Sequence, residues 1–149
     1  KACRAPAPRG VGVARFVPLL TARCVVDKAK EDRLRTQMIE AAEQCERTAL
    51  PKVEALAKLD ALLRDWPEGR AIYFCDERGG EPIGDLLKTA TGPAAILIGP
   101  EGGFTPEERR MLRTMPYVIP VSLGPRILRA ETAVIAALSV IQSAWGDWR

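Results

Sequence analysis

The chain contains no histidine among its 149 residues. General-base schemes that use imidazole, including the Ser-His-Asp and Cys-His arrangements, therefore cannot operate within it. The four cysteines stand far apart, without a C-x-x-C pair and without a histidine to complete a zinc site. We accordingly expect no bound metal and no hydrolase of these classes.

Long apolar runs are also missing. The longest, near the C-terminus, is interrupted by Ser139, Gln142 and Ser143 and is too short to span a bilayer. No charged-then-apolar leader opens the chain. These features predict a soluble protein in a reducing, cytoplasmic setting. Because the first residue is Lys1 rather than Met, we expect the chain to be part of a longer protein.

A strong excess of one charge is absent as well, since 22 Lys and Arg face 19 Asp and Glu, for a net charge of +3. Phosphate binding depends on basic residues gathered on one surface, so this small excess permits an RNA partner without selecting one. The length and a hydrophobic share of 47% suit a single domain over residues 1–149.

The pattern along the chain predicts strands that alternate with helices. Residues 1–12 are rich in Pro, Arg and Gly and are expected to be irregular. Apolar and β-branched runs predict strands at residues 13–20, 22–26, 70–75, 94–99 and 117–122, with a turn over residues 76–82. Apolar spacings of three and four predict helices over residues 31–50 and 53–66, and a helical turn over 83–87. This order favours an α/β domain with a mainly parallel sheet and helices on both faces.

Two further helices are expected in the C-terminal third. Thr105 has the features of an N-cap, with Pro106 at the first helical position and Glu108 placed for a capping box, so a helix should begin there and end before Pro116. The helix over residues 131–145 is apolar nearly all round. Such a helix is buried either in a monomer core or at a subunit interface.

One strand-to-helix connection, ILIGPEGGFTPEE, is unusually rich in glycine. Gly99, Gly102 and Gly103 flank Pro100 and Glu101. Glycine lets the backbone turn sharply and lets a ligand approach main-chain groups closely. The pattern matches neither the dinucleotide G-x-G-x-x-G nor a phosphate P-loop. An ordinary tight loop and a ligand-binding loop both remain open on this evidence.

A second connection, VSLGPRILRAETA, breaks an apolar strand with Gly124 and Pro125 and carries Arg126 and Arg129 before the last helix. A plain connection with two solvated arginines is one interpretation. The other is a pocket for a flat heterocycle, because apolar side chains and unpaired backbone groups occur together here. In open parallel sheets, ligands bind outside the carboxyl ends of the strands, where both connections should lie.

Together, GPEGGFTPEE and SLGPRILRAETA resemble the paired C-terminal motifs of the RsmE family of SPOUT methyltransferases, which modify small-subunit ribosomal RNA. The segments EAAEQCERTALPKVE and VPLLTARCVV are similar to their counterparts in the same family, and the resemblance covers about residues 13–148. It implies an enzyme that transfers a methyl group from S-adenosylmethionine to N3 of a uridine in 16S ribosomal RNA. It also implies a C-terminal deep trefoil knot and a homodimer formed through the last helix. Family members carry an N-terminal β-barrel domain related to PUA modules, which is not among residues 1–149.

Carried onto this sequence, the resemblance assigns cofactor contacts to two sets of residues, with the backbone of Leu123, Ile127 and Leu128 reading the adenine. The full set is Cys75, Gly99, Glu101, Gly102, Gly103, Leu123, Gly124, Ile127, Leu128 and Thr132.

The acceptor implies a second group of residues. Uridine N3 carries a proton, so the site must stabilise the negative charge that develops on the uracil oxygens. Arg126 and Arg129 are the candidates, because arginine stays charged and presents several donors. Their alternative role is to bind RNA phosphate or the cofactor carboxylate. Glu131 is a candidate base, with hydroxide as the alternative.

Two other functions stay open on the sequence. The chain could be a SPOUT methyltransferase that acts on another RNA, including a ribose hydroxyl, or an RNA-binding or assembly module that keeps the fold without catalysis.

Overall fold

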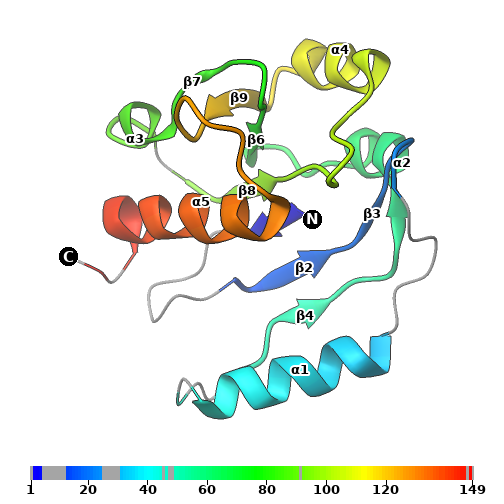
Figure 1. Ribbon diagram of the computed structural model, residues 1–149, viewed down its shortest axis with the longest axis vertical. Coiled ribbons are helices and arrows are strands. Elements are labelled where there is room, and N and C mark those ends of the chain that lie inside the picture. Colours follow the sequence, from blue (N-terminus) through cyan, green and yellow to red (C-terminus); the bar gives the residue numbers. More distant parts are fainter. Residues whose placement is uncertain are drawn as a thin grey trace.

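The computed structural model describes residues 2–4, 13–24, 31–44, 46, 49–90, 92–146 and 148. Strands and helices alternate over most of this part of the chain (Figure 1). In chain order they are β1 (Ala2–Arg4), β2 (Arg15–Val17), β3 (Leu19–Leu20), α1 (Glu31–Gln44), β4 (Lys52–Val53), β5 (Ala57–Lys58), α2 (Leu59–Arg64), β6 (Ala71–Cys75), β7 (Glu81–Pro82), α3 (Ile83–Leu86), β8 (Ala94–Leu97), α4 (Pro106–Thr114), β9 (Val118–Ser122) and α5 (Ala130–Trp145).

The main sheet has seven strands in the order β4-β2-β1-β8-β6-β9-β7. The run β8, β6, β9 and β7 is parallel throughout, whereas β1 is antiparallel to both of its neighbours. Strands β3 and β5 form a separate parallel pair. Helix α1 lies beside β4, at the edge of the sheet opposite β7 (Figure 1).

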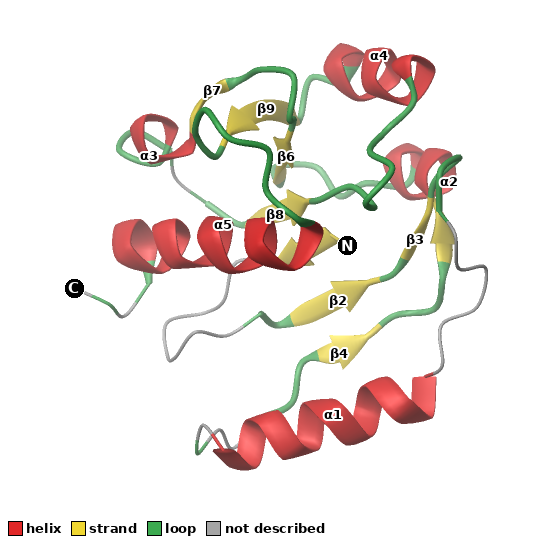
Figure 2. Ribbon diagram, viewed as in Figure 1, coloured by secondary structure: helices red, strands yellow, loops and turns green. Residues whose placement is uncertain are grey.

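Side chains of the central strands alternate between two hydrophobic clusters, as the twofold period of a strand requires. Ile72 and Phe74 of β6 join one cluster with residues of α2 and α4, and Tyr73 joins the other with residues of α3 and α5. Figure 2 shows the helices around the sheet. The expected α/β class, with parallel strands covered on both faces, is confirmed.

Helix α4 begins as its sequence predicts. The Thr105 hydroxyl accepts a hydrogen bond from the Glu108 amide at 3.2 Å, and the Glu108 carboxylate accepts one from the Thr105 amide at 2.9 Å. Pro106 takes the first helical position, where its missing N–H costs no hydrogen bond. The predicted start of this helix is confirmed, because the capping residues that determine it are adjacent in the chain.

Two expectations near the N-terminus are wrong. Residues 2–4, expected to be irregular, form β1, which pairs with β2 and β8; residues 1 and 5–12 lie outside the described part. The expected strand at 22–26 is a turn over its first residues, closed by the Cys24 amide on the Thr21 carbonyl at 3.1 Å, and its residues 25 and 26 are not described. The first error arises because partners distant in the chain decide whether three residues form a strand, and the second because a local hydrogen bond closes a turn.

The two expected helices in the first half are shorter than predicted. The helix over 31–50 ends at Gln44, and Glu46 has a φ of 54°, which cannot continue a right-handed helix. The helix over 53–66 begins only at Leu59. Residues 52–58 are extended instead, because their amides donate to the β2–β3 segment: Lys52 to Ala14, Glu54 to Phe16 and Ala57 to Pro18, at 2.9 to 3.1 Å.

The segment after β6 also differs from its prediction. Residues 76–82 are expected to be a turn, but Glu81 and Pro82 form β7 and pair in parallel with Val121 and Ser122 of β9. Strand β9 therefore lies between β6 and β7, which follow each other in the chain. The loop over residues 76–80 has to cross β9 to join them.

Candidate functional site

The carboxyl ends of β6, β8 and β9 meet at one edge of the sheet, because these three strands are parallel neighbours. The segments that follow them surround a cavity of about 530 Å³, within the usual size of a small-molecule site. Its lining comprises Cys75, Asp76, Glu77, Ile98, Gly99, Pro100, Glu101, Gly103, Phe104, Arg109, residues 121–131 and Ala133.

The glycine-rich segment after β8 is a tight turn held against its surroundings. The Gly103 amide donates to the Pro100 carbonyl at 2.8 Å, and Gly103 has a φ of +65°, which suits glycine. A Cβ on Gly99 would lie 2.8 Å from the ring of Phe104, so a side chain there would displace that ring. Phe104 itself packs edge-on against Phe74 of the central strand, with ring centroids 5.2 Å apart. Glycine is thus needed at these positions for packing as well as for turning.

The segment after β9 leaves its polar side chains toward solvent. Gly124 has a φ of +112°, and its amide donates to the Ser122 hydroxyl at 3.2 Å. Ile127 is 79% exposed although it lines the cavity. Arg126, Arg129 and Glu131 line the same cavity and are exposed. An exposed isoleucine beside arginines at a cavity mouth is a surface suited to a flat ligand with an anionic edge.

The structure brings nearly all of the residues singled out in the sequence to this one cavity. Of the proposed cofactor and catalytic residues, only Gly102 and Thr132 are outside the lining. Thr132 is exposed on the first turn of α5. Gly102 faces the segment after β3 instead, where its carbonyl accepts a hydrogen bond from Arg23 Nη1 at 3.0 Å and a Cβ would lie 3.2 Å from the Arg23 Cβ.

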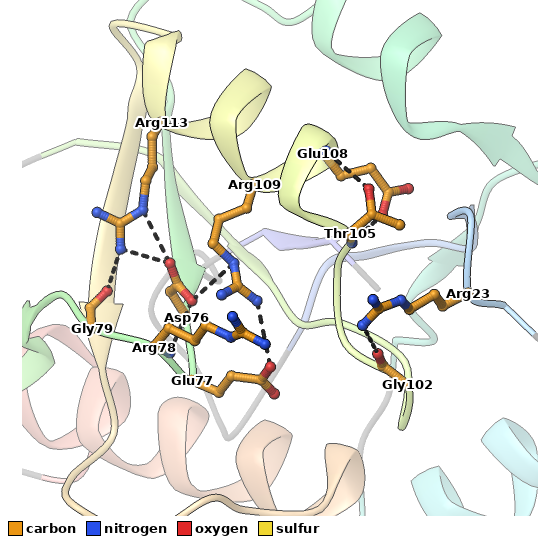
Figure 3. Close-up of polar contacts among 10 residues, drawn as sticks. All are labelled: Arg23, Asp76, Glu77, Arg78, Gly79, Gly102, Thr105, Glu108, Arg109 and Arg113. Carbon is orange, nitrogen blue, oxygen red and sulfur yellow. Dashed lines mark hydrogen bonds and ion pairs between the residues drawn. The ribbon is translucent and has the colours of Figure 1, made fainter.

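The segment after β3 also contacts the start of α4. The Ala22 amide donates to Glu108 Oε1 at 2.7 Å, while Oε2 of the same carboxylate closes the capping box with Thr105. Figure 3 shows the Thr105–Glu108 capping box and the Arg23–Gly102 hydrogen bond. The segment after β3 therefore contacts both the glycine-rich turn, at Gly102, and the start of α4, at Glu108.

Cys75, at the end of β6, lines the cavity as a thiol. Burial raises its pKa from 9.0 to about 12, so the thiol is protonated near neutral pH. A protonated thiol is a weak nucleophile. Cys75 thus offers shape and an apolar surface, and no thiolate for covalent catalysis.

A charged cluster, three of whose four members line the cavity, was not predicted from the sequence. It consists of Asp76 and Glu77 after β6 and Arg109 and Arg113 on α4 (Figure 3). A usable signal was present, because two carboxylates directly follow a buried strand whose carboxyl end lies at the ligand-binding edge. The arginines carried no comparable signal, since exposed arginines on a helix are common.

Two further findings concern the described residues alone. They contain no group of three His, Cys, Asp or Glu side chains placed to hold a metal ion. Over the same residues, no helix combines the length and the apolar character needed to cross a membrane.

Comparison with known proteins identifies the family of the chain. The model of a family described as an RNA methyltransferase domain matches residues 10–142. The chain therefore belongs to the RNA methyltransferase domain family. Its relatives include proteins named ribosomal RNA small subunit methyltransferase E from Synechocystis, 37% identical over 89% of this chain, and from Bacillus subtilis, 36% identical over 88%.

Solved structures show the same likeness. The ribosomal RNA small subunit methyltransferase E of Neisseria gonorrhoeae, bound to S-adenosyl methionine, is 31% identical and superposes with a TM-score of 0.84 over 93% of this chain and 58% of the other. A Legionella pneumophila methyltransferase in complex with the same cofactor is 37% identical, with a TM-score of 0.75 over 91% and 57%. The chain spans about half the length of the curated relatives, covering 46% of the Synechocystis protein and 56% of the Bacillus one.

Proposed function

We propose that the chain binds S-adenosylmethionine in the cavity at the ends of β6, β8 and β9 and transfers its methyl group to N3 of a uridine in small-subunit (16S) ribosomal RNA. The observation that carries the proposal is that residues from both methyltransferase-like motifs, 99–101 with Gly103 and 123–131, line one cavity of suitable volume. Relatives in the same family carry the corresponding name, and two of their solved structures hold this cofactor.

The lining fits the cofactor chemically. Backbone groups of Leu123, Ile127 and Leu128 lie on one side and would receive the adenine, whose edge carries hydrogen-bond donors and acceptors. Gly99 and Gly103 also line the cavity, and a Cβ there would meet the Phe104 ring or the Glu77 carboxylate, two other lining residues. The bound cofactor would supply an activated methyl group on a sulfonium, without metal chemistry.

The chain's own residues would act on the acceptor base. Arg126 and Arg129 are exposed at the cavity edge, where a uracil would enter. Their guanidinium groups would stabilise the negative charge that forms as N3 loses its proton. Glu131, in the first turn of α5, would accept that proton or orient a water that does.

A test begins with calorimetry of the chain with S-adenosylmethionine and with its demethylated product. Binding of both is expected, and absence of heat from folded protein would defeat the pocket assignment. Transfer of labelled methyl groups to small ribosomal subunits, followed by mapping of the modified nucleotide, tests the reaction itself. A ribose product would point to another methyltransferase class, and RNA binding without transfer would point to an assembly module.

We also propose that the C-terminal segment forms the deep trefoil knot of SPOUT proteins. The position of β9 between β6 and β7 supports this, because the loop over residues 76–80 must then pass across β9. Gly80 lies so close to that strand that a Cβ would be 2.6 Å from the backbone of Pro120 and Val121. After β9 passes this loop, residues 123–129 connect it to α5 (Figure 2).

A homodimer through α5 completes the proposal. The buried face of α5 includes Ala137 and Ile141, and Ile141 is 1% exposed within the single chain. The opposite face carries Ile135, which is 67% exposed. On a helix that is apolar nearly all round, this exposed side chain supports contact with a second copy. Ile135, and not Ile141, is therefore the position at which association should be tested.

A further inference from the structure

Asp76 is a buried carboxylate to which the proposed chemistry gives no role. Its side chain is completely buried. Among the described residues, the other buried polar residue is Gln142. A charge removed from water in this way is tolerated only where several partners compensate it. Nε and Nη2 of Arg113 donate to Oδ2 at 3.1 and 2.7 Å, the Arg78 amide donates to Oδ1 at 3.0 Å, and Arg109 Nε lies 3.5 Å from Oδ1.

These partners come from α4 and from the loop after β6, both of which contribute residues to the cavity lining. Arg109 and Arg113 are four residues apart on α4 and so share one face of that helix, which begins directly after the glycine-rich turn. Arg113 Nη2 also donates to the Gly79 carbonyl at 2.7 Å, in the loop that crosses β9. The Asp76 amide donates to the Val121 carbonyl of β9 at 3.0 Å. Figure 3 shows Asp76 between the two arginines.

The same cluster reaches the glycine-rich turn. Arg109, whose side chain is 13% exposed, lines the cavity, and its Nη2 lies 3.4 Å from Oε1 of Glu77. The Glu77 carboxylate in turn sits 3.0 Å from the point that a Cβ on Gly103 would occupy. Asp76 and its arginines therefore connect all three segments that surround the cavity.

We propose that Asp76, held by Arg113, is a positioning residue that sets the spacing between the glycine-rich turn, the end of β6 and the end of β9, and so the shape of the cofactor pocket. It acts through these segments and not on the reacting atoms. The inference rests on the proposed function for the identity of the ligand, S-adenosylmethionine.

The test compares two arginines of the same helix. Arg113→Gln removes the guanidinium donors to Asp76 and Gly79, and because Arg109 and the Arg78 amide still face the Asp76 carboxylate the variant should fold. Its dissociation constant for S-adenosylmethionine, measured by calorimetry, should rise roughly tenfold, the equivalent of one lost hydrogen bond to a charged group. Arg110→Gln is the matched control, because Arg110 pairs with Glu107 in solvent at 3.3 Å. Its dissociation constant should equal that of the unmodified chain.

A second control distinguishes positioning of the pocket from general stabilisation of the fold. Tyr117→Phe removes the hydrogen bond from the Tyr117 hydroxyl to the Leu63 carbonyl, away from the cavity. It should lower the melting temperature without changing cofactor affinity. If Arg113→Gln behaves in the same way, losing stability with unchanged affinity, positioning by Asp76 is refuted.

Hydrogen exchange tests the inference without any ligand. Arg113→Gln should speed exchange at the amides of Asp76 and Gly103, which donate to Val121 and Pro100 in the intact cluster. Unchanged exchange at both amides would overturn the positioning role. Failure of the unmodified chain to bind the cofactor would instead count against the proposed function, while the exchange result still decides the role of Asp76.

Discussion

Cys75 shows at the scale of one residue how the cavity alters acid-base behaviour. The thiol is held in its neutral form because burial raises its pKa from 9.0 to about 12. Between these values the folded chain keeps a proton that the unfolded chain loses, so the free energy of unfolding must fall as the pH rises above about 9. Below that range both states are protonated, and the thiol contributes no pH dependence.

This linkage can be measured with Cys75→Ser, which removes the ionisable thiol at nearly constant size. The melting temperature of the unmodified chain should drop between about pH 8 and about pH 10.5, and the drop should be smaller in the variant. Equal drops in both proteins would show that Cys75 is not the group responsible.

Arg129 is one of the two arginines proposed to stabilise the uracil anion. If its guanidinium stabilises the uracil anion, Arg129→Ala should lower the rate of methyl transfer to small ribosomal subunits by about two orders of magnitude, the usual loss for a missing electrostatic donor. Affinity for S-adenosylmethionine should be unchanged. Arg110→Ala, which removes another exposed arginine paired only with Glu107, is the control and should be fully active. Weaker cofactor binding with a normal rate would assign Arg129 to the cofactor carboxylate instead.

At the scale of elements, the crossing of the 76–80 loop over β9 depends on Gly80. A methyl group there would lie 2.6 Å from the backbone of Pro120 and Val121, which cannot move without disturbing the sheet. Gly80→Ala should therefore destabilise the chain by about 1–3 kcal/mol in denaturant unfolding. In Gly84→Ala, a Cβ meets nothing within 4 Å and the residue is in α3, so this control should be neutral or stabilise by up to about 1 kcal/mol. Equal effects of the two substitutions would contradict the close crossing.

Elements whose signals are local could be predicted from the sequence, and those made by distant partners could not. The capping box of α4 and the apolar run of β8 involve residues that are adjacent in the chain, and both occur where expected. Residues 53–58 look helical by apolar spacing, yet they are not, because Glu54 and Ala57 donate to the carbonyls of Phe16 and Pro18. Strand β1 is a similar case, since three residues carry too little pattern to indicate their pairing.

The same distinction applies to the site. The two glycine-containing segments could be found because glycine and proline at the end of a strand are visible in the sequence. In the cluster around Asp76, the two carboxylates after β6 carry a similar signal, but their pairing does not, because it joins residues 76–79 to Arg109 and Arg113 over more than thirty positions. Arg23 contacts Gly102 over a still longer separation, and nothing in the sequence near either residue indicates it.

At the scale of the whole molecule, association through α5 is the testable property. Ile135→Asp would place a carboxylate in the proposed contact and should weaken dimerisation by several kcal/mol, because the charge would lose its water. Light scattering at micromolar concentration measures this directly. Ile39→Asp, on the distant helix α1, is a matched control, since Ile39 is also exposed and should tolerate the change. A monomeric unmodified chain would remove the dimer from the proposal.

The position of β9 between β6 and β7 also has a consequence for synthesis. A chain leaves the ribosome with its N-terminus first. Strands β6 and β8 and the glycine-rich turn therefore emerge before residues 121–131, which complete the cavity lining. Until residues 118–131 have left the exit tunnel and β9 has paired between β6 and β7, a nascent chain has neither the full sheet nor a complete cavity. The cofactor would then recognise only finished chains, and its binding energy would stabilise the last step of folding without guiding the earlier ones.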